Sequence, residues 1–176
     1  MNDRELQKRL QSVRLFFCDV DGILTDSAVW MGPLDEMKRF VVQDGLGQRL
    51  LQREGIKIGW VSNRPSIATS QRALDLKVDF LVQALDGDKV AAIQKILTET
   101  GVPWEQICYL GDDLVDLGVL KRAGLSVTVP HAGPECQALA HYVTQREGGH
   151  GAVREVIDLI LKAQGKWEKL IAFYTQ

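Results

Sequence analysis

The sequence predicts an α/β fold, a Rossmann-like parallel sheet with helices on both faces. Short β-branched or apolar runs alternate along the chain with longer segments of helical periodicity. Alternation at these lengths implies right-handed crossovers between parallel strands. Acidic and hydroxyl side chains follow several of the strand runs directly. In open α/β sheets the ligand site lies at the carboxyl ends of the strands, so these polar residues mark the candidate site.

The individual elements follow from composition and spacing. With 176 residues, 45% of them hydrophobic, the chain can form one domain with a full core, expected over 1–165. The expected strands are 13–18, 56–62, 80–82, 107–110 and 126–129, and the expected helices between and after them are 45–53, 67–74, 88–100, 114–122, 134–140 and 151–163. In the last helix, apolar residues recur at three- and four-residue spacing and predict core contact.

Two segments depart from the alternation. Residues 29–42 predict two short strands around Gly32-Pro33, a small projecting hairpin with Lys38 on its return arm. The tail, 166–176, is rich in aromatic residues but too short to fold alone. It is expected to dock on the body of the protein, to dock on a neighbouring subunit, or to remain loose.

Composition excludes several classes of function. The net charge is -2 and the charged residues are scattered, so no nucleic-acid partner is expected. The longest apolar stretch is shorter than a bilayer span, and residues 1–14 are polar rather than signal-like, so no membrane partner is expected. The three cysteines lack metal-ligand spacing. A soluble cytoplasmic protein is therefore expected.

The most informative motif is an acidic pair at the end of the first strand. Asp19 and Asp21 are separated by one residue, and Gly22 lets the chain turn away beside them. Like charges at this spacing are costly unless a cation or a shared proton relieves them. The pair indicates a metal-assisted site or a nucleophile beside an acid/base, and the alternative is a solvated acidic turn.

A second acidic cluster follows the strand expected over 107–110. A helix beginning there would place Asp112 and Asp116 one turn apart on the same face, with Asp113 between them. Acidic residues also cap helix N-termini, which is the alternative explanation. Together with Asp19 and Asp21, however, the cluster has more negative charge than capping needs, and an oxygen-rich set of this kind suits Mg²⁺.

Two further positions fit an anionic ligand. Lys89 opens a helix, where the helix dipole disfavours a cation, so a nearby anionic site would explain it. Its ammonium could neutralise a carboxylate and a phosphoryl oxygen, and an exposed lysine is the alternative. Ser62, Asn63 and Arg64 follow the second strand and offer a hydroxyl and backbone N–H groups to phosphate oxygens. Arg64 could instead be a surface residue.

These residues resemble the motifs of the haloacid dehalogenase superfamily, in the same chain order: Asp19-x-Asp21, Ser62, Lys89 and Gly111-Asp112-Asp113-x-x-Asp116. The resemblance implies that Asp19 is the nucleophile and forms an aspartyl phosphate. It implies that Asp21 protonates the leaving group and then activates water. Mg²⁺ would be held by the side chains of Asp19 and Asp112 and the backbone carbonyl of Asp21, with Asp113 and Asp116 in support.

An acid/base at Asp21 favours rapid hydrolysis of the phosphoenzyme, so the resemblance implies a phosphatase rather than an ATPase. The intervals between the motifs leave room only for the hairpin, and a capless member is expected. Such an open site must accept a macromolecule or borrow walls from another subunit.

A narrower resemblance covers residues 15–163, nearly the whole chain. It rests on Asp19-Val-Asp-Gly-Ile-Leu-Thr25-Asp26, Lys38-x-Phe40, Asp44-Gly45, Arg64-x-Ser66 and Gly148-Gly149-His150-Gly151-Ala152-Val153-Arg154-Glu155. These segments resemble the 3-deoxy-D-manno-octulosonate 8-phosphate phosphatases, which are homotetramers. The resemblance implies a sugar-phosphate substrate, self-association through the hairpins, and substrate-facing roles for Lys38, Arg64 and the segment 148–154. A flexible loop entering the last helix is the alternative for that glycine-rich segment.

The sequence departs from this family at Ser27, Asn63, Gln83 and Ala84 and just before Lys38. Because these positions cluster in the hairpin and the phosphate-side loops, they leave the sugar open. A nine-carbon ulosonate 9-phosphate phosphatase is the nearest alternative. An oligomerisation module of sugar-nucleotide synthesis and a monomeric phosphoprotein phosphatase are the others.

Overall fold

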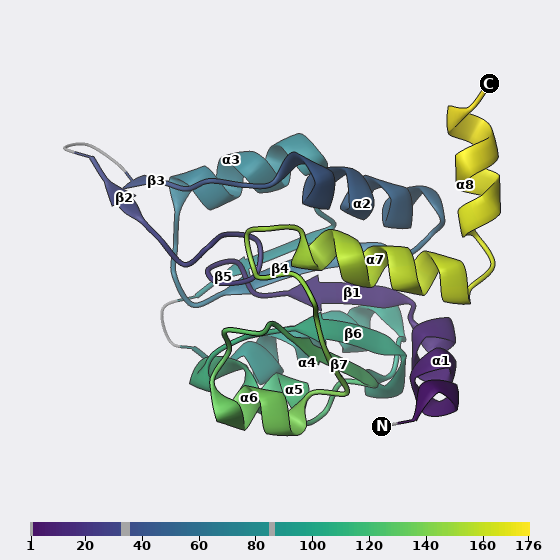
Figure 1. Cartoon of the computed structure of the whole chain (residues 1–176). Coiled ribbons are helices and arrows are strands. Elements are labelled where there is room, and N and C mark those ends of the chain that lie inside the picture. The colour runs from purple at the N-terminus through teal and green to yellow at the C-terminus, as the bar shows by residue number, and fades with distance from the viewer. Residues whose placement is uncertain (1, 33–35, 85–86) are drawn as a thin grey trace.

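The computed structural model describes residues 2–32, 36–84 and 87–176 and shows a sheet between two helical layers (Figure 1). Six parallel strands take the order β5-β4-β1-β6-β7-β8. The strands are β1 (Leu15–Cys18), β4 (Lys57–Ser62), β5 (Phe80–Gln83), β6 (Ile107–Leu110), β7 (Leu125–Thr128) and β8 (Tyr142–Val143). This arrangement confirms the predicted fold class.

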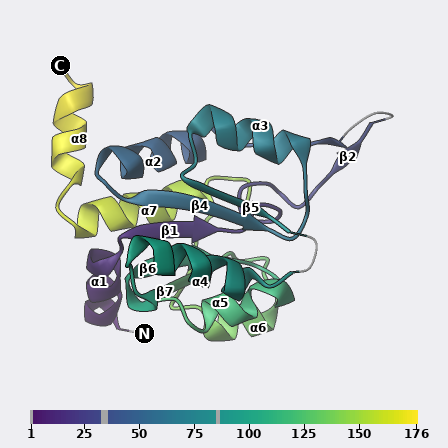
Figure 2. The same cartoon turned by 180° about the vertical axis from the view of Figure 1, so that it is seen from behind.

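Helices cover both faces of the sheet, as predicted (Figures 1 and 2). One face carries α2 (Val42–Arg53), α3 (Ile67–Leu76) and α7 (Ala152–Ala163), and the other carries α4 (Lys89–Thr100), α5 (Leu117–Leu120) and α6 (Pro134–Leu139). A short 3₁₀ turn, η1 (Trp104–Gln106), precedes β6. The core lies between the layers and includes Phe16 and Phe17 on β1 and Trp60 on β4, all fully buried.

Several elements differ from the prediction. The helix expected over 114–122 is a 3₁₀ turn, η2 (Leu114–Asp116), followed by the single-turn helix α5. The Asp116 carboxylate accepts the N–H groups of Asp112 and Asp113, which tightens this turn. Helix α2 begins three residues earlier than expected, at Val42 rather than at residue 45. Strand β8 has two residues, too few for a periodic signal.

The chain ends also form helices that periodicity did not predict. Helix α1 (Asp3–Ser12) is capped by Asn2, whose side chain accepts from Glu5 N at 2.9 Å, and Leu10 is its one buried residue. A helix this polar has too few apolar positions for a periodic pattern. Helix α8 (Trp167–Tyr174) follows α7 and buries Leu170. Of the alternatives for the tail, the structure shows contact with the body at this residue.

The predicted hairpin is present and projects from the edge at which β1 ends (Figure 1). Strands β2 (Trp30–Met31) and β3 (Glu36–Met37) are antiparallel, with Trp30 opposite Met37. The expected turn at Gly32-Pro33 falls partly outside the described residues. Trp30, Met31 and Met37 are 65%, 76% and 62% exposed. Across the described ranges, no helix is both long and apolar enough to cross a bilayer.

Candidate active site

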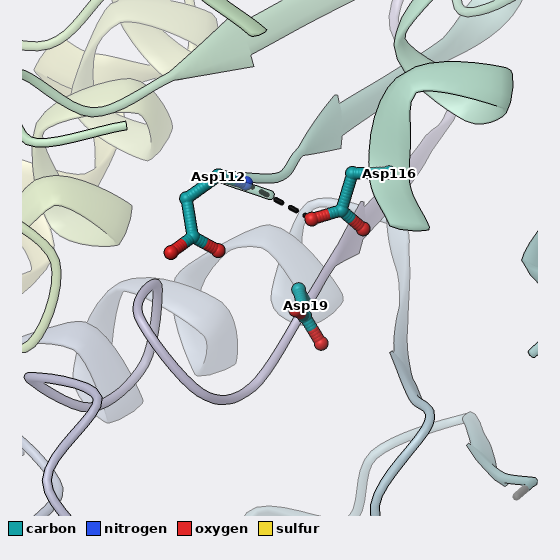
Figure 3. A group of neighbouring side chains, drawn as sticks. All are labelled: Asp19, Asp112 and Asp116. Atoms are coloured by element: carbon teal, nitrogen blue, oxygen red, sulfur yellow. Dashed lines mark hydrogen bonds between the residues drawn. The ribbon is translucent and has the colours of Figure 1, made fainter. Parts of the chain in front are cut away.

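The carboxyl ends of β1 and β6 bring together three aspartates from distant parts of the sequence (Figure 3). Asp19 follows β1, whereas Asp112 and Asp116 follow β6, and the two strands pair with Cys18 opposite Leu110. One carboxylate oxygen from each aspartate lies within 4.8 Å of the others. The cluster that the sequence predicted at this edge of the sheet is therefore present in the structure.

Gly22 makes this close approach possible. Its φ is +91°, and a Cβ at this position would lie 2.0 Å from Oδ2 of Asp112. A side chain here would be strained and would also displace the Asp112 carboxylate. The glycine after the acidic pair thus serves both the turn and the packing of the second acidic loop.

Asp116 is completely buried, and protein donors surround its carboxylate. Its Oδ1 accepts from Lys89 Nζ at 2.7 Å and from the Tyr109 hydroxyl at 2.5 Å. Its Oδ2 accepts from the N–H group of Asp112 at 3.0 Å (Figure 3) and from that of Asp113 at 3.2 Å. With these four donors, Asp116 is suited to hold the acidic loop in place rather than to bind a ligand.

Asp19 and Asp112, in contrast to Asp116, have carboxylate oxygens that can accept further hydrogen bonds. Oδ1 of Asp19 accepts from Val20 N at 2.7 Å and lies 3.0 Å from Lys89 Nζ. Within 2–32, 36–84 and 87–176, neither Oδ2 of Asp19 nor the Asp112 carboxylate has a protein hydrogen-bond donor. These oxygens can therefore still accept a hydrogen bond or bind a cation.

The environment of these carboxylates favours a bound cation. Burial, and then repulsion from Asp116, raises the pKa of Asp19 to about 7 against the opposing effect of Lys89. Burial, and then repulsion from Asp19 and Asp116, raises the pKa of Asp112 to about 7. A divalent ion would remove this repulsion, and the all-oxygen donor set fits a hard ion such as Mg²⁺.

Lys89 is the cation that the protein itself supplies. It is the first residue of α4, it is 2% exposed, and its Nζ bridges Asp19 and Asp116. Although burial acts to lower it, attraction to these two carboxylates raises the pKa of the Lys89 ammonium. A lysine at a helix start, the feature noted in the sequence, is explained by this buried ion pair.

Asp21 points to the hairpin side of the site. Its Oδ1 and Oδ2 lie 2.8 and 2.9 Å from Nζ of Lys38, whose side chain is fully buried. Lys38 also lies 3.6 Å from Oε1 of Glu36 on β3. The return arm of the hairpin therefore reaches the second residue of the acidic pair directly.

The side chains expected to face phosphate after β4 contact other protein groups in the structure. The Ser62 hydroxyl is buried and contacts the backbone N and O of Arg64 at 3.1 and 3.2 Å. The Arg64 guanidinium forms an ion pair with Glu36. Asn63 lies beside Gly87, where its Nδ2 would be 3.1 Å from an added Cβ. Asn63 and Arg64 thus lie in the loop between β4 and α3, in contact with Gly87 and with Glu36 of the hairpin, and the binding of phosphate by Ser62, Asn63 and Arg64 stays a prediction.

The second acidic cluster is correctly placed, but its predicted geometry is wrong. Asp112 precedes the helical turn, so Asp112 and Asp116 do not share a helix face. Asp113 is exposed and caps η2 by accepting from Leu114 N at 2.7 Å. The capping explanation thus applies to Asp113, while Asp112 faces Asp19.

The sequence reasoning missed Tyr109. This fully buried tyrosine on β6 donates to Asp116, and burial, followed by repulsion from Asp116, raises the pKa of its hydroxyl. A hydroxyl inside an otherwise apolar strand, just before an acidic loop, was the available signal. Buried tyrosine hydroxyls need a partner, and an acidic residue nearby supplies one.

Comparison with known proteins identifies the family. A family model described as haloacid dehalogenase-like hydrolase matches residues 80–157. The 3-deoxy-D-manno-octulosonate 8-phosphate phosphatase of Yersinia pestis is 42% identical over 162 residues, 92% of this chain and 86% of that protein. This chain belongs to the haloacid dehalogenase-like hydrolases. Within them, this hydrolase is close to the 3-deoxy-D-manno-octulosonate 8-phosphate phosphatases.

Solved structures have the same fold as this hydrolase over nearly its whole length. The 3-deoxy-D-manno-octulosonate 8-phosphate phosphatase of Moraxella catarrhalis, solved with a magnesium ion, a phosphate ion and a KDO molecule, is 36% identical with a TM-score of 0.95 over 98% of this chain and 99% of that one. The cobalt-bound phosphatase of Haemophilus influenzae is 34% identical with a TM-score of 0.86, over 90% and 92% of the two chains.

Proposed function

We propose that this chain is a Mg²⁺-dependent phosphatase that hydrolyses 3-deoxy-D-manno-octulosonate 8-phosphate through an aspartyl-phosphate intermediate on Asp19. The observation that carries the proposal is the cluster in which one carboxylate oxygen each of Asp19, Asp112 and Asp116 lies within 4.8 Å of the others, beside the buried Lys89 ammonium. It combines a nucleophilic carboxylate with positive charge to offset phosphate repulsion. The choice of sugar rests on the relatives, which are 36–42% identical to this chain and are named as phosphatases of this substrate.

In the first step, a carboxylate oxygen of Asp19 attacks phosphorus. The bond between phosphorus and the sugar oxygen breaks, and that oxygen takes a proton from the Asp21 carboxyl. A carboxylate needs no base to act as a nucleophile at neutral pH. Lys89 reduces the repulsion between Asp19 and the phosphate and holds the carboxylate in place through its bridge to Asp116.

In the second step, Asp21 accepts a proton from a water molecule as the water attacks phosphorus. The bond between phosphorus and Asp19 breaks and inorganic phosphate is released. Asp21 is bound to Lys38 in the structure, so its carboxyl must exchange this contact for the sugar oxygen or the water. The hairpin is therefore adjacent to the proton transfers of both steps.

The Asp19 and Asp112 carboxylates and the Asp21 carbonyl would hold Mg²⁺. When bound, the ion supplies positive charge that screens the attacking carboxylate from the phosphate and stabilises the charge that develops on its oxygens. Asp116, whose four acceptor contacts are already made within the protein, orients the loop that carries Asp112.

We expect Asp112→Asn to separate metal binding from folding. Without metal, the variant should be more stable than the wild type, because it removes a buried carboxylate that repels Asp19 and Asp116. Millimolar Mg²⁺ should raise the melting temperature of the wild type and raise that of the variant much less. Thermal unfolding in EDTA and in Mg²⁺ measures both effects, and equal Mg²⁺-induced shifts in the two proteins would contradict the ligand assignment.

The partner proposed for this phosphatase is a second copy of itself, within a homotetramer. An isolated site open to water would hold a small sugar phosphate poorly. The hairpin beside Asp21 presents exposed Trp30, Met31 and Met37, the kind of side chains that interfaces bury. Light scattering after size-exclusion chromatography tests the assembly. A monomer would favour a macromolecular phosphate ester as the substrate.

Phosphate release tests the function. Purified protein should release phosphate from the eight-carbon ulosonate 8-phosphate faster than from a nine-carbon ulosonate 9-phosphate or an aryl phosphate, and EDTA should stop all three reactions. Faster release from the nine-carbon sugar phosphate would support the proposed reaction but would show that the substrate is a nine-carbon ulosonate 9-phosphate. No release from any of them would overturn the proposal in favour of an oligomerisation module.

A further inference from the structure

The segment that leaves the hairpin crosses the turn carrying Asp21. Its first two residues contact this turn and the third contacts β4. Lys38 binds Asp21, as described above. The next residue, Arg39, binds Asp26 at the other end of the same turn. Phe40 then stacks on Trp60 of β4, with ring centroids 6.1 Å apart and planes 11° from parallel. The hairpin is thus attached to both ends of the 20–26 turn.

Arg39 joins that turn to a third segment. Its Nη2 lies 2.9 Å from Oδ2 of Asp26, 3.2 Å from the Gly149 carbonyl and 3.2 Å from Nε2 of His150. Nδ1 of His150 lies 3.0 Å from the Gly148 carbonyl, which can only accept. With the proton on Nδ1, His150 donates to Gly148 and accepts from Arg39, so one tautomer satisfies both contacts.

The loop 148–150 packs its backbone directly on the same turn. The Gly149 N–H donates to the Ile23 carbonyl at 3.0 Å. A Cβ on Gly148 would lie 1.7 Å from the Gly22 carbonyl oxygen, and one on Gly149 would lie 2.4 Å from Asp26 N. Gly148 does not have a positive φ, so the close approach of the Gly22 carbonyl, rather than the backbone conformation, explains why a glycine stands at this position.

We propose that Arg39 is a positioning residue: it clamps the 20–26 turn between the hairpin and the 148–150 loop and so fixes Asp21 for the proton transfers. This inference rests on the proposed function, but the clamp itself is a physical feature that is measurable without substrate. Arg39 does not touch the carboxylate cluster. Its effect passes through Asp26 at one end of the turn and through Lys38, its neighbour in the chain, at the other.

Arg39→Met and Asp26→Asn test the clamp. The Arg39 side chain is 52% exposed, so its removal should leave the fold intact. Amide hydrogen exchange of residues 23–25 should accelerate about tenfold or more in both variants, because their turn hydrogen bonds open more often. With substrate, kcat should fall about 10- to 100-fold while KM changes little, since Asp21 rather than substrate binding is displaced.

The double variant should resemble either single variant, because the two residues act as one unit. Arg39→Lys should recover part of kcat, since an ammonium can still reach Asp26. Arg4→Met, an exposed arginine of α1 at the opposite end of β1, is the matched control and should change neither readout. Unchanged exchange and unchanged kcat in Arg39→Met would overturn the proposal. Faster exchange in Arg39→Met than in the wild type, together with no phosphate release by the wild type, would overturn only the proposed function.

Gly148→Ala tests the second half of the clamp. The added methyl must push the Gly22 carbonyl away, so kcat should fall further than in Arg39→Met, with faster exchange at residues 23–25. Gly133→Ala is the control, because its added Cβ would meet only the flexible end of Glu135 at 3.3 Å. Equal kcat and equal exchange in the two alanine variants would contradict the role of the loop.

Discussion

Asp19→Asn should lower the rate of phosphate release by at least about 10³-fold while the protein stays folded, because an amide is not a competent nucleophile. The substitution keeps the shape of the side chain and removes one charge from the cluster. It loses attraction to Lys89 and also loses repulsion from Asp112 and Asp116, so the net effect on stability should be small. Phosphate release and a melting curve on the same preparation measure both quantities.

Asp75→Asn is the control for this prediction. Asp75 lies on the surface of α3, pairs with Arg72 and is remote from the cluster, so its substitution should leave turnover unchanged. An Asp19→Asn protein that retains more than a few per cent of wild-type turnover would show that another group attacks phosphorus.

Lys89→Met should be the most destabilising single change in the site. It removes the cation between two buried carboxylates and leaves Asp19 and Asp116 facing each other. Breaking a buried ion pair from one side costs about 3–5 kcal/mol, because the remaining charge has lost its partner. Chemical denaturation in EDTA measures the loss, and Lys95→Met, an exposed lysine on the same helix, is the control.

The double variant Lys89→Met/Asp116→Asn separates stability from chemistry. It removes one of the two facing charges, so it should recover part of the lost stability while turnover stays low. A Lys89→Met protein as stable as Lys95→Met would contradict the buried bridge. Full turnover in the double variant would show that Lys89 has no part in the reaction.

The stability of Lys89→Met should also depend on pH in a defined direction. Burial already raises the pKa of Asp19 to about 7, and removing Lys89 removes an effect that lowers it. The folded state then binds the proton more tightly than the unfolded chain, whose carboxylates titrate near about 4. The contribution of Asp19 to the stability of the variant should therefore be fully present below about pH 4 and be lost as the pH rises through its folded-state pKa, which lies above the wild-type value of about 7.

The location of the site could be predicted because it depends on strand ends. An apolar run followed by Asp19, and another followed by Asp112, place both residues at the same edge of any parallel sheet. That rule needs only the order of the elements. The resemblance to known phosphatases then added roles for Asp21 and Lys89, and these roles stay predictions.

Which of the acidic residues is held by protein donors, and which is not, could not be predicted from the sequence. Asp112 and Asp116 look alike in sequence, and their difference arises from donors elsewhere in the fold: Lys89 on α4 and Tyr109 inside β6. Likewise, the contact between Lys38 and Asp21 depends on how the hairpin folds back across the turn. Contacts between distant segments set these partners, and local periodicity carries no information about them.

The most direct test of the proposed chemistry is to trap the phosphoryl group. Asp21→Asn should still allow Asp19 to attack a substrate with a good leaving group, such as an aryl phosphate, but should slow hydrolysis of the intermediate. Rapid acid quenching followed by peptide mass spectrometry should find one phosphoryl group on Asp19. If the wild type turns over substrate but Asp21→Asn carries no phosphoryl group on Asp19, the mechanism is contradicted. A phosphoryl group on another residue would also contradict it.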